Sequence, residues 1–86
     1  MGVDDGQLLR EFARTGAEPA FAQIVHRHAA TVFGVCRSAL GNSADAEDAA
    51  QATFLTLAQK ARSLAGHRSI GGWLHRVAWH IALRAR

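Results

Sequence analysis

The stretch from Pro19 to Leu40 constrains the fold most, because it predicts one long helix with a whole side to bury. Its apolar residues keep the three-four spacing of a helix face. That face consists of Phe21, Ile24, Val25, His28, Val32, Val35, Cys36 and Ala39. Pro19 suits a first helical position, and Gly41 suits the end because glycine adopts the left-handed conformation at little cost.

Three further helices are predicted around this one. They span residues 5–14 after a capping Asp4 or Asp5, residues 44–64 after Asn42 or Ser43, and a last segment from a capping Ser69 to the end. Abundant alanine, few β-branched residues and a single early proline favour helix over sheet. The fold class is therefore all-α, a compact bundle of four helices in one domain. Its expected core holds Phe21, Ile24, Val32, Phe54, Leu57, Leu74, Val77 and Ile81.

Charge is divided unevenly along the chain. Residues 1–57 hold all seven acidic residues and four arginines, whereas residues 58–86 hold six basic residues and no acid. The basic part can meet phosphate and the acidic part a basic protein surface, although a small protein can also carry such charges as solvated faces.

Signs of a membrane span, secretion or catalysis are missing from the sequence. No apolar run approaches the ~20 residues that cross a bilayer. No basic segment opens the chain as in a signal peptide, and the lone Cys36, placed in an apolar stripe, favours a core role in a reducing cytoplasm. His26 and His28 lie on different sides of a helix, which is poor metal geometry. We therefore expect no catalytic residue, metal or cofactor, and no enzyme.

The outward side of residues 44–64 carries one leucine among polar residues. That side consists of Glu47, Asp48, Gln51, Leu55, Gln59 and Arg62. An exposed leucine beside acids and glutamines forms a small amphipathic patch that suits the docking of another protein's helix. The alternative is a solitary surface leucine, which is common.

The last helix interleaves cations with aromatic residues away from its apolar stripe of Leu74, Val77, Ala78, Ile81 and Ala85. The opposite side holds His75, Arg76, Trp79, Leu83 and Arg86, with Trp73, His80 and Arg84 along one edge. Such a surface can bind nucleic acid, since arginine contacts phosphate and indole stacks on a base. Alternatively, Trp79 packs against Leu8 and Phe12 of the first helix.

Three segments, in order, resemble the extracytoplasmic-function sigma factors of bacteria. They are "LLREFARTGAEPAFAQIVHRH", the acidic-Gln-Phe pattern of "DAEDAAQATF", and the Trp-Leu-x-Arg-x-Ala pattern of "WLHRVA". The resemblance covers almost the whole chain. It implies that residues 1–86 form a sigma region 2 domain, and that the region 4 helix-turn-helix of the family lies outside this chain.

The resemblance also implies partners. Region 2 docks on the clamp helices of the RNA polymerase β′ subunit, and it recognises and melts the promoter minus-ten element by binding its non-template strand. The polymerase side would be Glu47, Asp48, Gln51 and Leu55. The DNA side would be Arg62, His67, Arg68, Arg76, Trp79, His80 and Arg84, with an extruded base held by the loop "RSLAGHRS". An anti-sigma factor is a further partner that the family allows.

The sequence leaves the base preference at His80 and the role of the chain open to alternatives. Many family members carry Asn at the position of His80, so the base preference is not given by the resemblance, and Trp73 is interpreted first as a packing residue. The competing functions are a helical protein-interaction adaptor without DNA binding and a membrane-surface binder that uses the basic last helix.

Overall fold

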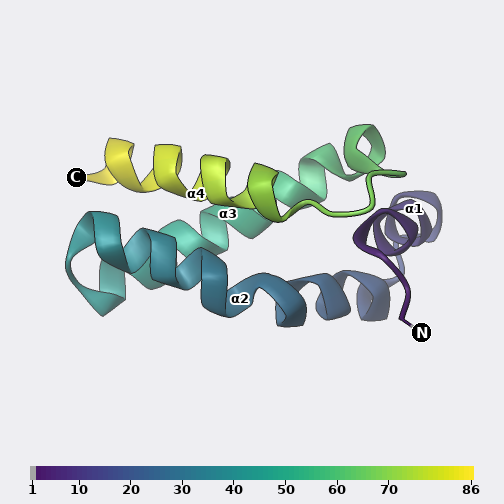
Figure 1. Cartoon of the computed structure of the whole chain (residues 1–86), viewed down its shortest axis with the longest axis horizontal. Coiled ribbons are helices and arrows are strands. Elements are labelled where there is room, and N and C mark those ends of the chain that lie inside the picture. The colour runs from purple at the N-terminus through teal and green to yellow at the C-terminus, as the bar shows by residue number, and fades with distance from the viewer. Residues whose placement is uncertain (1) are drawn as a thin grey trace.

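The computed structural model describes residues 2–86 as four helices joined by short connections (Figure 1). They are α1 (Asp5–Thr15), α2 (Glu18–Leu40), α3 (Ser43–Leu64) and α4 (Gly71–Ala85). The predicted all-α class is confirmed, and each boundary lies within two residues of its expected place. None of these helices has the length and hydropathy to cross a bilayer.

Local sequence signals explain where the helices begin and end. Asp4 caps α1 with a reciprocal capping box to Gln7, and Asn42 caps α3 by accepting the Asp45 N–H. Gly16 and Gly41 end α1 and α2 in the left-handed conformation.

The predicted cap of the last helix is wrong by one position. Ile70, which is buried in the core, occupies the N-cap of α4, and its hydrocarbon side chain can accept no capping hydrogen bond. Ser69 still helps, since its Oγ accepts the Gly71 N–H at 3.3 Å.

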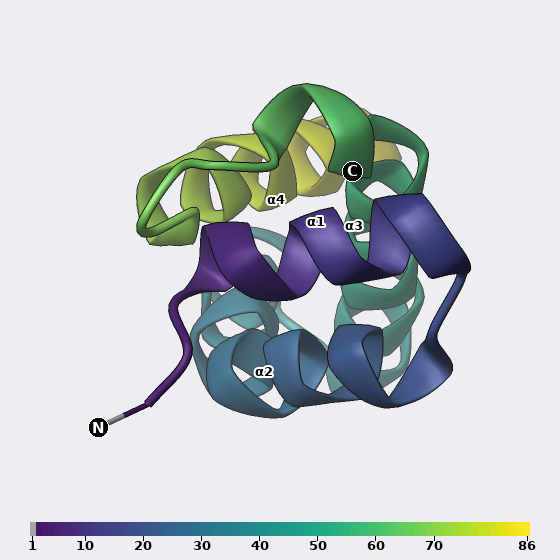
Figure 2. The ribbon, with the colours of Figure 1, turned by 90° about the vertical axis from the view of Figure 1, so that its right-hand side faces the viewer.

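The helices are arranged around the α2–α3 pair. α4 packs on both of them, whereas α1 crosses one end of the bundle and packs on α2 and α3 (Figure 2). Many of the buried residues of α3 and α4 are small, namely Ala46, Ala49, Ala61, Ala78 and Ala82. Fully buried Leu9, Ile24 and Leu57 add about 1.5–3 kcal/mol each by leaving water.

The predicted core is half right. Ile24, Val32, Leu57 and Leu74 are fully buried, but Phe21, Phe54, Val77 and Ile81 are only half-buried. The buried line of α4 consists of Leu74, Ala78 and Ala82, and the expected Ala85 is exposed.

The contact line of α3 passes through Leu57 as expected, but it leaves Phe54 only half-buried. It runs through Ala49 and Thr53, whose hydroxyl donates to the Ala49 carbonyl at 2.8 Å. The buried line of α3 therefore contains small residues beside Leu57, while the larger Phe54 lies at its edge and is partly exposed.

Candidate functional site

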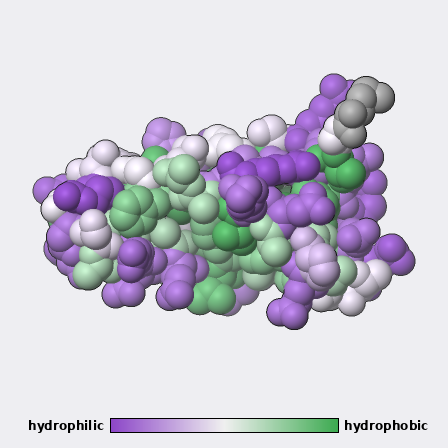
Figure 3. Space-filling view, turned by 90° about the horizontal axis from the view of Figure 1, so that it is seen from below, coloured by the Kyte–Doolittle hydropathy of each residue, from purple (hydrophilic) through white to green (hydrophobic). Residues whose placement is uncertain are grey.

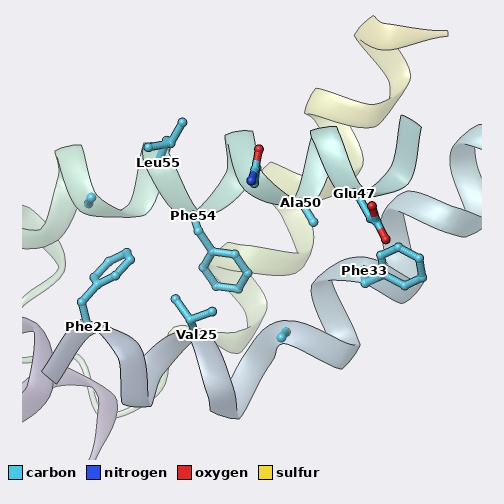
Figure 4. Close-up of a pocket in the computed structure, with 10 residues that line it drawn as sticks. Phe21, Val25, Phe33, Glu47, Ala50, Phe54 and Leu55 are labelled. Carbon is cyan, nitrogen blue, oxygen red and sulfur yellow. The ribbon is translucent and has the colours of Figure 1, made fainter. Parts of the chain in front are cut away.

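An open apolar groove runs between α2 and α3, with a volume of about 680 Å³. Its lining residues are Phe21, Val25, Ala29, Phe33, Glu47, Ala50, Gln51, Phe54, Leu55 and Ala58. Figure 4 shows Phe21 and Val25 of α2 and Phe54 of α3 pointing toward one another. Viewed from below, the molecule presents apolar residues along the middle of one face, bordered by hydrophilic ones (Figure 3). Monomeric proteins seldom leave several aromatic side chains partly exposed together, so the groove is a candidate docking site.

Three of the four residues expected on the polymerase side line this groove. Glu47, Gln51 and Leu55 contribute to its rim, and Leu55 is 66% exposed on the outer edge of α3. The expectation of a solitary leucine is therefore wrong, because Leu55 borders a groove that contains Phe54. Asp48 is exposed beside Glu47 and outside the lining.

Sequence reasoning missed the groove itself, since it assigned Phe21, Val25 and Phe54 to a closed core. The groove stays open because α1 and α4 pack on other sides of the α2–α3 pair. One signal was present in the sequence. Apolar residues recur every four positions along α2, from Phe21 to Phe33, as a second stripe beside the one through Ile24 and Val32.

The outer surface of α4 is a second candidate. Gly72, His75, Arg76 and Trp79 line a shallow hollow there, and Trp79 is 42% exposed. The alternative in which Trp79 packs on Leu8 and Phe12 is wrong, because α1 packs on α2 and α3 and makes no helix contact with α4.

Three further residues along the edge of α4 lie as the sequence predicts. His80 and Arg84 are exposed, as expected for an outer edge. Trp73 is half-buried against the core, in agreement with its interpretation as a packing residue.

The structure does not gather all seven residues expected on the DNA side. Arg62 lines a separate hollow between α1 and α3, together with Phe12 and Gln59. His67 and Arg68 are exposed in the connection between α3 and α4, and only Arg76 and Trp79 share a hollow. The set therefore consists of an α4 surface, a loop and a detached arginine.

The connection from Ala65 to Ile70, here called the α3–α4 loop, is tied to the start of α1 by a buried carboxylate. Asp5 is only 5% exposed, and its Oδ2 accepts the Ile70 N–H at 3.0 Å. The same oxygen lies 3.0 Å from Nε2 of His28, and Oδ1 lies 3.2 Å from Nη1 of Arg27. Asp5 was expected only as a cap, and His28 only as part of an apolar face.

The surroundings of this carboxylate favour its charged form. Burial raises the pKa of Asp5, but the Ile70 N–H, the hydrogen bond and charge of His28, and the Arg27 guanidinium outweigh it and hold that pKa below 3.8. The ionised carboxylate is therefore the form that the fold binds best.

The one cysteine is placed for packing. Cys36 is fully buried against α4, and burial raises the pKa of its thiol despite a hydrogen bond with Thr53. A protonated, enclosed thiol is a poor nucleophile, which agrees with the expected core role. Within residues 2–86, no three His, Cys, Asp or Glu side chains are arranged to hold a metal ion.

Two matches with known proteins bear on this arrangement. The family model of sigma-70 region 2 matches residues 24–86, which take in α3, α4 and most of α2. The chain is 31% identical over 70 residues to the ECF RNA polymerase sigma factor SigW of Bacillus subtilis (strain 168). That alignment covers 81% of this chain but 37% of the relative, so the chain spans little more than a third of that protein's length. No solved structure matches significantly. The resemblance in the sequence is thereby confirmed, and this four-helix chain belongs to the sigma-70 region 2 family as a domain of the extracytoplasmic-function type.

Proposed function

We propose that the chain acts in bacterial transcription initiation, with the α2–α3 groove docked on the β′ clamp helices of RNA polymerase core. The α3–α4 loop and α4 would then recognise and melt the promoter minus-ten element by binding its non-template strand. The observation that carries the proposal is that one small bundle has two surfaces of contrasting chemistry. One is an apolar groove with an acidic rim, and the other is a basic helix without acidic residues.

The shape and chemistry of the groove support a helical partner. It lies between two adjacent antiparallel helices, and an amphipathic helix fits such a groove by inserting side chains at three-four spacing. The aromatic side chains of Phe21, Phe33 and Phe54 provide apolar contact area, as at the centre of other interfaces. Glu47 at the rim and the exposed Asp48 beside it would pair with basic residues on the partner and speed the encounter.

The basic surface supports single-stranded DNA as the second partner. Arg76 and Arg84 offer cations for phosphates, and the exposed ring of Trp79 offers a face for stacking on a base. The loop residues His67 and Arg68 extend this surface toward the end of α3. A base outside the stack is read by groups on its edges, which a loop can surround.

The proposed unit includes α1, although the family match begins at residue 24. Leu8 and Leu9 of α1 belong to the same buried cluster as Ile24 and Leu57, so residues 1–86 would act as one region 2 domain. We place its action in the cytoplasm, and we propose that an anti-sigma factor would compete for the groove.

Two exposed leucines provide a matched test of the polymerase surface. Leu55 borders the groove, whereas Leu83 lies on α4. Capture of purified RNA polymerase core by the immobilised chain should fall for Leu55→Ala combined with Asp48→Arg, and stay unchanged for Leu83→Ala. Equal capture by all three proteins would remove the groove from the docking site.

The adaptor function has one observation in its favour, since Trp79 and Leu83 expose apolar area on α4 that a second protein helix could cover. It predicts no binding of single-stranded DNA. Anisotropy of a labelled minus-ten strand separates the two functions, because the sigma function requires that strand to bind better than a scrambled strand of equal length.

A further inference from the structure

We propose that Asp5 and Gly6 of α1 are positioning residues for the α3–α4 loop, and that they thereby set which base the loop selects. The inference rests on the proposed function, in which this loop meets the minus-ten strand. It assigns a role in DNA selectivity to a helix that lies outside the matched residues 24–86.

Backbone and side-chain bonds hold the loop against α1 at three places. The Gly66 N–H donates to the Gly6 carbonyl at 3.4 Å, and the Asp5 N–H donates to the Arg68 carbonyl at 3.2 Å. The Ile70 N–H donates to Oδ2 of Asp5 at 3.0 Å. The beginning, the middle and the end of the loop are therefore each bonded to two consecutive residues of α1.

The carboxylate that receives the loop is itself held from the other side by α2. Arg27 donates to Oδ1, and His28 contacts Oδ2 at the same oxygen that accepts from Ile70. Arg27 also donates to the carbonyl of Val3, which ties the segment before α1 to α2. Because its partners are fixed on both sides, the buried carboxylate keeps one orientation. Its hydrogen bond to the Ile70 N–H therefore fixes the position of the end of the loop.

Gly6 permits this close approach. A Cβ at this position would come within 2.8 Å of the Gly66 carbonyl carbon and of the His67 nitrogen, and nearer still to the His67 carbonyl oxygen. All three atoms belong to the backbone, which cannot move aside as a flexible side chain can. An alanine here would therefore push the loop away from α1 without changing any charge.

A consequence for selectivity follows from what the loop carries. The side chains of His67, Arg68 and Ser69 are exposed, while the backbone that bears them is bonded to α1. Base edges carry sequence information and phosphates do not. Moving the loop should therefore change the base that is preferred, while the phosphate contacts of Arg76 and Arg84 on α4 continue to supply general affinity.

The experiment uses the 86-residue chain and a single-stranded DNA pool with a short randomised segment. Strands enriched by the unaltered chain are sequenced, and the enriched strand is compared with its scrambled counterpart by anisotropy. For Asp5→Ala and for Gly6→Ala, the ratio of the two affinities should fall by roughly tenfold, about the share of one base contact. Affinity for the scrambled strand should stay within about twofold, because α4 is unaltered.

Two matched controls separate positioning from a general effect on α1 or on glycine content. Gly34→Ala makes the same substitution in α2, where the added Cβ meets no atom within 4 Å. Asp4→Ala removes the capping box of α1 but leaves the bonds of Asp5 to the loop intact. Both controls should keep the selectivity of the unaltered chain.

A readout that needs no DNA accompanies the binding test. Hydrogen exchange of the Ile70 amide should accelerate in Asp5→Ala while amides in the middle of α2 and α3 remain protected, which shows local release in a folded chain. Asp5→Asn keeps one carbonyl acceptor for the Ile70 N–H, so it should restore part of both the protection and the selectivity. Should Asp5→Ala fail to fold, Asp5→Asn and Gly6→Ala carry the test.

The outcomes distinguish the inference from the function on which it rests. If the unaltered chain enriches no sequence, the proposed DNA function fails and the positioning role fails with it. If the unaltered chain selects a sequence, and Asp5→Ala and Gly6→Ala select it equally well with an exposed Ile70 amide, the positioning role is wrong while the DNA function stands.

Discussion

The α2–α3 groove and the outer surface of α4 are both exposed, but they differ in the residues that form them. The groove is lined by aromatic and aliphatic side chains, and the one charged residue in its lining is the acidic Glu47 at the rim. The α4 surface has its apolar area in Trp79 and Leu83 only, and its charges are all basic. One surface suits a partner that buries apolar area, and the other suits a partner that brings phosphates.

The difference teaches how a short chain can carry two binding surfaces. Four helices are too few to enclose every side of α2 and α3. Because α4 and α1 cover the other sides of the pair, the side toward Phe21 and Phe54 stays open. The exposed groove is thus a consequence of the packing geometry, whereas the α4 surface is a consequence of which residues face outward from a helix that is already well packed.

The largest effect should come from the core side of α3, next to the groove. Leu57 is fully buried and Leu55 is mostly exposed, so the same substitution probes two sides of one helix. Leu57→Ala should lower the free energy of unfolding by about 2–5 kcal/mol. Leu55→Ala should change it by no more than about 0.5 kcal/mol. Urea denaturation measures both values. Similar losses of unfolding free energy in the two variants would show that Leu55 stabilises the fold as much as a buried leucine does.

The second effect concerns binding through the groove. Asp48→Arg with Leu55→Ala removes an apolar contact and reverses a rim charge, so affinity for RNA polymerase core should fall by about tenfold or more. Affinity for single-stranded DNA should not fall in the same variant, because α4 is untouched. A parallel loss of both affinities would mean that the two surfaces do not work separately.

A smaller effect is expected in the salt dependence of DNA binding. Each phosphate contact to a single strand contributes about 0.7 to the slope of log affinity against log salt. Arg76→Ala should weaken all sequences alike and reduce this slope by about that amount. Titrations at several salt concentrations test it, and Arg37→Ala, a basic residue in the last turn of α2, is the control. An unchanged slope would remove Arg76 from the phosphate contacts.

The smallest effect should appear in the pH dependence of stability. Burial raises the pKa of Asp5 and so offsets part of the lowering that its hydrogen bonds cause. The pKa of this carboxyl is lowered in the folded chain, so its contribution to stability is present above about pH 3.8 and is lost as the pH falls through the folded pKa. Asp5→Asn should flatten that part of the acid-unfolding curve, whereas the exposed Asp48→Asn should not. Identical curves for the unaltered chain and Asp5→Asn would contradict the anchoring of the carboxylate.

Helix positions were predictable because their signals are local. A capping aspartate, an early proline and the glycine at the end of α2 each act within one turn of the chain, so the sequence alone indicates them. The expected candidate residues were readable for a similar reason, since outward positions follow from the helix phase. Leu55, Arg76 and Trp79 all lie on exposed sides as that phase requires.

The phase of packing was less predictable, because hydrophobicity ranks side chains by their transfer from water and not by how closely they let helices approach. Val77 and Ile81 are more apolar than Ala78 and Ala82, yet the two alanines are buried in line with Leu74 while Val77 and Ile81 are half-buried. Likewise, Phe54 was assigned to the core by its spacing, while the structure leaves it lining the groove. The choice depends on the neighbouring helices, which periodicity within one segment does not describe.

By itself, the sequence determined the all-α class, the helix boundaries, the family and the separation of acidic from basic charge, since each depends on residue type and short-range spacing. Only the tertiary structure decided that α1 and α4 leave one side of the α2–α3 pair uncovered, and that the Asp5 carboxylate accepts a hydrogen bond from the Ile70 N–H. Those two residues are far apart in the chain, and a single hydrogen bond between them leaves no periodic trace. The glycine after Asp5 permits the close approach of the loop backbone, but a helical glycine does not by itself reveal such a contact, since a Cβ at Gly34 in α2 would meet no atom within 4 Å.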